Sequence, residues 1–150
     1  MKIEKRPLLF DNVLVYETTQ LKEDWTESYL MMEGLPLLEN VYQNGPVFFS
    51  VAPVEGEEKF GHFTFYLPIN LPVQTNNEKP VHFQERFELN NALCLRQADE
   101  ELDFYAAYEK VKKYAEKENI KLKDIYYIVL LEVFDDVLID LYVPIEEELS

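Results

Sequence analysis

The stretch VLIDLYVPI, residues 137–145, decides the fold, because the stretch FTFYLPI at residues 63–69 repeats its pattern. Successive side chains of a β-strand point to opposite faces. One face aligns Phe63 with Ile139, Phe65 with Leu141 and Leu67 with Val143, and the other face aligns Tyr66 with Tyr142. Both stretches end in Pro-Ile. Two equivalent strands so far apart in the chain predict a duplicated fold.

The residues upstream of each stretch extend the duplication. Residues 12–20 and 91–97 both begin with Asn, continue with four apolar residues and precede an acidic helix start. Helical spacing predicts one helix over residues 24–42 and another over residues 99–119, capped by Asp24 and Asp99.

Two residues interrupt the first helix. Gly34 is flexible, and Pro36 removes a backbone donor and clashes with the preceding turn. We therefore predict a kink here, or a break into two short helices.

These elements predict an α+β fold in a single domain over residues 1–150. Two β-α-β-β repeats, at about residues 8–70 and 86–146, are joined by an irregular connection at about 71–85 that is rich in Pro and Asn. The repeats form one mainly antiparallel curved sheet with two helices on one face and a cleft on the other. Each helix has one apolar stripe that needs cover, which places both helices on the same face.

Composition excludes several classes of partner. The formal net charge of −15 opposes nucleic acids and anionic membranes, because both bind through Lys and Arg. Neither a signal peptide nor a membrane span is evident, so we expect a cytoplasmic protein. Cys94, His62 and His82 lack metal-site spacing, and no phosphate-binding loop or serine-hydrolase motif occurs. We expect no metal and no cofactor, and a binding domain more than an enzyme.

Alternation along the strands predicts which residues line the cleft. Asp140 is the central candidate, because a carboxylate beside tyrosine suits a cationic or amphipathic ligand. The other ligand-binding candidates are Tyr142, Tyr66, Thr64, Phe48, Tyr126, Glu132 and, from the first helix, Trp25. Each also has a simpler interpretation, as a surface charge for the carboxylates or as core packing for the aromatic residues.

Two substitutions follow from this arrangement. Asp140→Asn should weaken a cationic ligand while leaving the fold intact. Alternation puts Tyr127 on the face opposite Tyr142, so Tyr142→Ala should weaken binding more than Tyr127→Ala.

The pattern resembles the GyrI-like effector-binding domain. The resemblance rests on the duplicated β-α-β-β order, on Asn44-Gly45-Pro46 after the first helix and on the closing residues 140–145. In that family the last strand carries a glutamate that reaches a cleft for cationic, aromatic ligands. The resemblance implies this role for Asp140, which is one methylene shorter.

The resemblance also frames the alternatives. The chain also resembles uncharacterised proteins of low-GC Gram-positive bacteria, which are associated with gene loci of type VII secretion and its toxins. Our first interpretation is a stand-alone domain that binds cationic or amphipathic small molecules and has no DNA-binding module. The alternative is a protein-interaction or accessory protein, such as a chaperone, of a secretion or toxin locus. A third is a small hydrolase, because some stand-alone relatives use an acidic residue with tyrosine.

Overall fold

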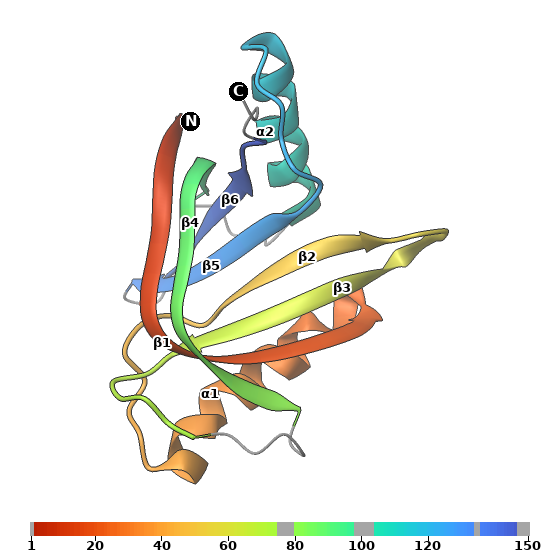
Figure 1. Cartoon of the computed structure of the whole chain (residues 1–150). Helices are drawn as coiled ribbons and strands as arrows, with labels where there is room; N and C mark the ends of the chain where they lie inside the picture. Colours follow the sequence, from red (N-terminus) through yellow and green to blue (C-terminus); the bar gives the residue numbers. More distant parts are fainter. Residues whose placement is uncertain (1, 75–79, 98–103, 134–135, 147–150) are drawn as a thin grey trace.

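The computed structural model describes residues 2–74, 80–97, 104–133 and 136–146 (Figure 1). The elements in chain order are β1 (Ile3–Leu21), the 3-10 turn η1 (Lys22–Asp24), α1 (Trp25–Glu39), β2 (Phe48–Val54), β3 (Glu57–Pro68), β4 (Val81–Gln97), α2 (Phe104–Lys117), β5 (Tyr126–Val133) and β6 (Asp136–Pro144). Strand, helix, strand, strand therefore occurs twice. None of the described helices is long and apolar enough to cross a membrane.

The six strands are joined by antiparallel pairing throughout, in the order β1-β3-β2-β5-β6-β4, and β4 pairs back onto β1 to close a barrel. β1 and β4 form a long ribbon that begins with the pair Ile3 and Leu95 and ends with the pair Tyr16 and Val81. This ribbon curves past the ends of the other strands in Figure 1. The α+β class and the antiparallel sheet with two helices are confirmed.

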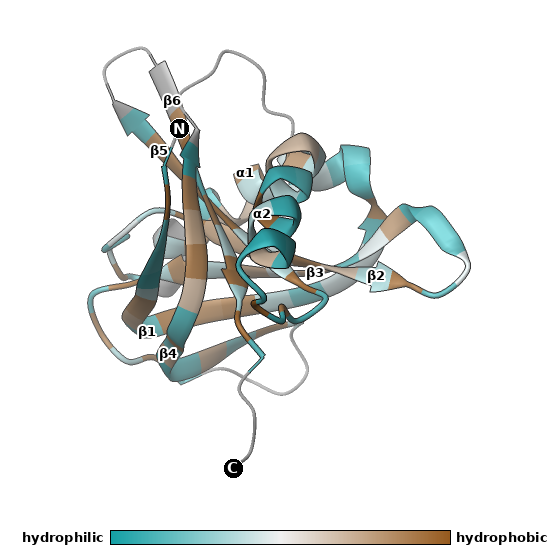
Figure 2. Ribbon diagram, turned by 90° about the horizontal axis from the view of Figure 1, so that it is seen from above, coloured by the Kyte–Doolittle hydropathy of each residue, from teal (hydrophilic) through white to brown (hydrophobic). Residues whose placement is uncertain are grey.

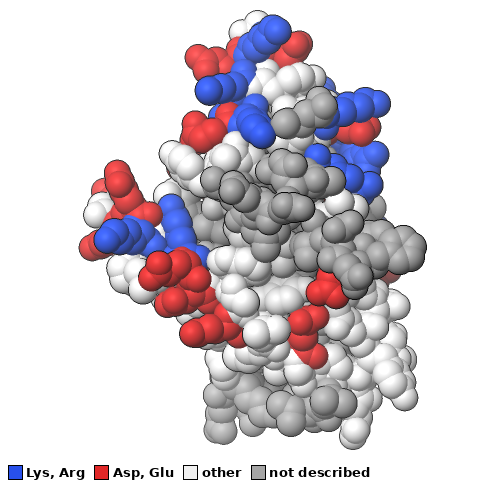
Figure 3. Space-filling view, turned by 180° about the vertical axis from the view of Figure 1, so that it is seen from behind, with Lys and Arg blue, Asp and Glu red and all other residues white. Residues whose placement is uncertain are grey.

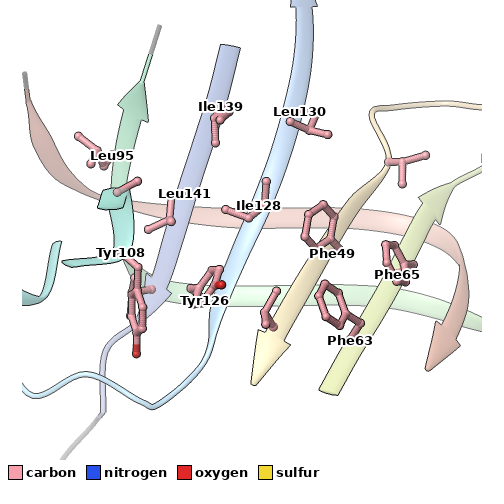
Figure 4. Close-up of a cluster of buried hydrophobic side chains, with 14 of the residues drawn as sticks. Phe49, Phe63, Phe65, Leu95, Tyr108, Tyr126, Ile128, Leu130, Ile139 and Leu141 are labelled. Atoms are coloured by element: carbon pink, nitrogen blue, oxygen red, sulfur yellow. The ribbon is translucent and has the colours of Figure 1, made fainter. Parts of the chain in front are cut away.

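Both helices cover one face of the sheet, over a cluster that we call the helix-side core. Its strand residues include Phe49, Phe63, Phe65, Leu95, Ile128, Leu130, Ile139 and Leu141, and its helix residues include Met32, Ala107, Tyr108 and Val111. Figure 4 shows these strand side chains pointing to the same side, with β1 crossing behind. Burial of this apolar stripe is what holds α1 and α2 on the sheet.

The opposite face, where we expected a cleft, carries a second cluster, the ribbon-side core. It comprises Leu8, Val13, Val15, Phe48, Tyr66, Phe87, Ala92, Cys94, Val129 and Tyr142. These residues come from all six strands, because the β1–β4 ribbon folds over this face. A hollow of about 310 Å³ beside this core is lined by Lys2, Glu4, Arg6, Cys94 and Arg96.

A residue with a left-handed backbone conformation changes which side chains of β1 face the ribbon-side core. Asn12 has φ 56°, a conformation that Asn tolerates better than most residues. Leu8 and Phe10 face the ribbon-side core before it, and Val13 and Val15 face the same core after it. The alternation therefore shifts by one residue at Asn12. Figure 2 shows the mixed hydrophilic and hydrophobic positions along β1 and β4.

The two halves repeat the same backbone hydrogen bonds. The N–H of Ile69 donates to the carbonyl of Asn12 at 2.8 Å, and that of Ile145 donates to Asn91 at 3.0 Å. The other matched donor–acceptor pairs are Asn44 to Pro68 with Lys123 to Pro144, Asn70 to Tyr42 with Glu146 to Lys121, and Val41 to Pro36 with Ile120 to Ala115. Asn40 and Asn119, which follow the helices, have φ 56° and 57°.

Several predicted boundaries differ from the structure. β1 begins at Ile3 and β4 at Val81, so both strands are longer than predicted, because each pairs with the other along nearly its full length. α1 is one unbroken helix that contains Pro36. Asp24 is the last residue of η1 and makes no side-chain capping bond. The predicted cap Asp99 lies outside the described residues.

Candidate functional site

Four aromatic side chains meet between α1, α2 and β2, and we call them the aromatic group: Trp25, Tyr29, Phe49 and Phe104. The Trp25 ring stacks on Phe49 with centroids 5.6 Å apart and meets Phe104 edge-on at 5.1 Å. Tyr29, one turn along α1, meets Trp25 at 6.0 Å, again edge-on. Phe49 is fully buried, whereas the other three rings are partly exposed. The group is therefore rooted in the helix-side core and reaches the surface.

Two carboxylates, Glu33 and Glu132, act on the same region, and we call them the acidic pair. Glu33 follows Tyr29 by four residues and so shares its side of α1. Glu132 follows Ile128 and Leu130 on the helix-facing row of β5. Burial, then Glu33 and Glu132, raise the pKa of Tyr29 to about 12. Burial and the nearby Glu132 also raise the pKa of Glu33. Tyr29 and both carboxylates are thus electrostatic neighbours.

This arrangement favours a positive charge. Among the described residues no Lys or Arg forms an ion pair with Glu33 or Glu132. Aromatic faces attract cations, and two neighbouring carboxylates that repel each other are both stabilised when a cation comes between them. In the part of the chain that the structure describes, no group of His, Cys, Asp and Glu could hold a metal ion. An organic cation suits the site better.

The predicted site residues divide between the two faces. Phe48, Tyr66, Asp140 and Tyr142 lie on the ribbon side, where Phe48 stacks on Tyr66 at 4.7 Å. Thr64, two residues before Tyr66, is partly buried on the same strand row. Trp25 contributes to the aromatic group on the helix side.

Asp140 already has a cationic partner. Its carboxylate is almost fully buried and accepts two hydrogen bonds from the guanidinium of Arg96, from Nε at 2.7 Å and from Nη2 at 2.9 Å. Arg96 pairs with Asp140 across β4 and β6, which places both side chains on one face. The participation of Asp140 in a ligand site stays a prediction.

Three residues of β5 were assigned to the wrong face. Tyr126 belongs to the helix-side core and packs against Tyr108 at 4.6 Å, and Glu132 lies on the same row of β5, away from Tyr142. Tyr127 pairs directly with Tyr142 and packs against the ribbon-side core. Both faces of these strands are apolar, so alternation could not assign the faces. The predicted ranking of Tyr142→Ala over Tyr127→Ala therefore loses its basis.

Sequence reasoning did not select Tyr29, Glu33, Phe49 and Phe104 as site residues. Tyr29 carried a signal, because it follows Trp25 by four residues on the stripe of the first helix. Phe104 and Glu132 are brought to the site only by the packing of α2 and by the β2–β5 pairing.

The model of one protein family, described as a domain of unknown function (DUF5085), matches residues 9–148. The chain belongs to the DUF5085 family. A comparison of this DUF5085 protein with curated proteins finds no match.

Solved structures share the fold of the DUF5085 chain. The C-terminal domain of EcmrR has a TM-score of 0.69 at 14% identity, covering 99% of this chain and 100% of that domain. A hydrolase from Listeria innocua has a TM-score of 0.61 at 11% identity, covering 97% and 92%. SAV2435, in a structure bound to tetraphenylphosphonium, has a TM-score of 0.57 at 8% identity, covering 97% and 94%. These neighbours fit the GyrI-like fold expected from the sequence.

Proposed function

We propose that this DUF5085 protein is a ligand-binding domain that takes lipophilic organic cations at the aromatic group and the acidic pair. The observation that carries the proposal is the meeting of partly exposed aromatic rings with two carboxylates that have no basic partner among the described residues. The SAV2435 neighbour, which shares the fold, is bound to such a cation, tetraphenylphosphonium. That ligand combines positive charge with aromatic rings.

Each part of the site has a separate role in this proposal. Trp25, Tyr29 and Phe104 offer ring surfaces, and a cation over an aromatic ring gains about 0.5–2 kcal/mol depending on desolvation. Glu33 and Glu132 select positive over neutral ligands. Phe49 has no exposed surface and serves as the floor on which Trp25 stacks.

The test is a titration with tetraphenylphosphonium followed by tryptophan fluorescence. Trp25 is the single tryptophan, so the signal reports on the aromatic group directly. Glu132→Gln should weaken binding roughly tenfold, because it removes one charge-assisted contact at an exposed position. Glu33→Gln should weaken it in the same direction. Glu116→Gln, an exposed carboxylate on α2, is the matched control and should bind like the wild type.

Asp140→Asn distinguishes the two faces in the same titration. It should leave tetraphenylphosphonium affinity unchanged if the ligand binds on the helix side. Loss of affinity in Asp140→Asn but not in Glu132→Gln would place the ligand on the ribbon side and overturn the proposal.

One surface favours the alternative, a protein-interaction role. α1 exposes Leu30 by 60% and Met31 by 42% on its outer side, away from the sheet. Exposed apolar residues beside one another are typical of protein contacts. On this interpretation the partner is a polypeptide of the same locus, such as a secreted toxin. Leu30→Glu should abolish co-purification with that polypeptide and leave tetraphenylphosphonium binding intact; co-purification of the variant at the wild-type level would exclude this surface.

A further inference from the structure

A pocket of about 190 Å³ lies beside the aromatic group, between α2 and the end of β2 that leads to the β2–β3 hairpin. Its lining residues are Lys22, Val51, Ala52, Pro53, Tyr105, Tyr108, Lys112, Asp124 and Tyr126. Val51 follows Phe49 by two residues, and Tyr105 follows Phe104 by one, so the pocket is a neighbour of the proposed cation site. The pocket is lined by two lysines, whereas the proposed cation site carries two glutamates.

The walls of the pocket are aromatic and apolar. The rings of Tyr108 and Tyr126 pack 4.6 Å apart and are both mostly buried, and Tyr105 stands exposed at the rim. A cavity of about 150 Å³ is large enough to hold benzene. The space therefore fits one substituted aromatic ring.

Two lysines reach the pocket from different elements. Lys22 belongs to η1 and forms no ion pair within the part of the chain that the structure describes. Lys112 belongs to α2, lies 4.5 Å above the Tyr108 ring and pairs with Glu109 at 2.7 Å on the exposed side of the helix. Exposed pairs of this kind contribute only about 0–1 kcal/mol, so Lys112 can turn to another anion at little cost.

The one carboxylate in the lining is already engaged. Asp124 accepts a hydrogen bond from the hydroxyl of Tyr108 at 3.2 Å. Burial and this carboxylate raise the pKa of Tyr108 to about 12, so the phenol stays neutral at physiological pH. Lys22 and Lys112 against Asp124 give the lining residues a net charge of about +1, and Glu109, which pairs with Lys112, lies outside the lining. Figure 3 shows Lys and Arg side chains gathered around the α2 end of a molecule that is acidic overall.

We propose that this pocket is a second binding site, for a small aromatic carboxylate whose ring lies among the tyrosines and whose anionic group meets Lys22 and Lys112. The chemistry excludes the cations of the neighbouring site, which two lysines would repel. The proposal does not depend on the function proposed above, because it uses different residues and a ligand of opposite charge.

Three probes of one shape test the sign of the site: benzoate, neutral benzamide and cationic benzamidine. Binding is measured by titration of the amide resonances of residues 51, 52, 108 and 124–126 in two-dimensional NMR. We expect benzoate to bind at least about fivefold more tightly than benzamide, and benzamidine to bind most weakly. Equal affinities of benzoate and benzamide, or no shift with any probe, would overturn the proposal.

Substitutions test the two lysines. Lys22→Gln and Lys112→Gln should each weaken benzoate about threefold to tenfold and leave benzamide unchanged, since only the anion loses a partner. Lys113→Gln, the exposed neighbour on α2 that does not line the pocket, should bind benzoate like the wild type. An equal loss in Lys113→Gln would show a general effect of charge and no site. None of these variants changes a buried side chain, so the fold should be retained.

Discussion

Arg96 and Asp140 form the ion pair in which burial is most unequal among the described residues. The Arg96 side chain is 52% exposed, whereas that of Asp140 is 5% exposed. A buried carboxylate needs a partner, because an uncompensated charge away from water is unfavourable. The guanidinium of Arg96 therefore stabilises the buried carboxylate of Asp140 across the β4–β6 pair.

We predict that Arg96→Gln lowers the free energy of unfolding by about 1–3 kcal/mol, because Asp140 loses its charged donor while water can still reach the half-exposed site. Arg86→Gln is the matched control. Arg86 pairs with Glu88 at 2.6 Å with both side chains exposed, and its loss should change stability by about 0.5 kcal/mol or less. Urea unfolding measures both; equal effects would show that the Asp140 pair adds nothing special.

Glu33 predicts a dependence of stability on pH. Its pKa is raised in the folded protein by burial and by Glu132, so the folded state takes up a proton more readily than the unfolded state. Charged Glu33 is therefore unfavourable at neutral pH, and this penalty disappears as the pH falls through its raised pKa to below about 4.3, the usual value for Glu.

Glu33→Gln should consequently raise the melting temperature at pH 7, and the gain should vanish near pH 4. Thermal unfolding of the variant and the wild type at both pH values checks this. The charge control is again Glu116→Gln, which lies exposed on α2 and should show no such pH-dependent gain. A gain in melting temperature of equal size at both pH values would show that the ionisation of Glu33 is not its cause.

The elements differ in how well the chain predicts them. Both strand hairpins and both helices were predicted. The apolar stripe of α2 has helical spacing, and the hairpin strands are runs of β-branched and aromatic residues between turn residues. The N-terminal part of β1 was missed because its charged residues are exposed and make a strand only by pairing with β4. Local pattern does not contain that distant partner.

The candidate site shows the same limit. Trp25 and Glu132 were among the predicted residues, but they were assigned to a cleft centred on Asp140. Phe48 and Phe49 are both fully buried, so β2 has no polar face to show which side the helices cover. Where both faces of a sheet are buried, alternation separates two faces without saying which is which.

Glycines in two elements give opposite predictions. Gly34 lies inside α1, and a Cβ there meets nothing within 4 Å, so Gly34→Ala should stabilise the protein by about 1 kcal/mol through helix propensity. Gly61 lies in β3, where a Cβ would come within 3.0 Å of Phe63 and Val51, so Gly61→Ala should destabilise. Melting temperatures measure both effects. A higher melting temperature for Gly61→Ala would show that the side chains of Phe63 and Val51 move aside at little cost.

At the scale of the molecule, every strand of the barrel has a neighbour on both sides. The matched hydrogen bonds of the two halves support the division into repeats at about residues 8–70 and 86–146, which we keep as a proposal. If the repeats are equivalent, the amides of Ile69 and Ile145 should be protected to a similar degree in hydrogen exchange. Protection that differs by more than about a hundredfold would show that the halves open independently.

The β1–β4 ribbon has a consequence for synthesis of the chain. Ile3 pairs with Leu95, which lies far along the chain, and at about 5–20 residues per second Leu95 is made roughly 5–20 seconds after Ile3. During that time the apolar side chains of β1 that face the ribbon-side core have no β4 strand to pack against. Translation speed and chaperones that hold nascent chains should therefore influence the yield of this protein.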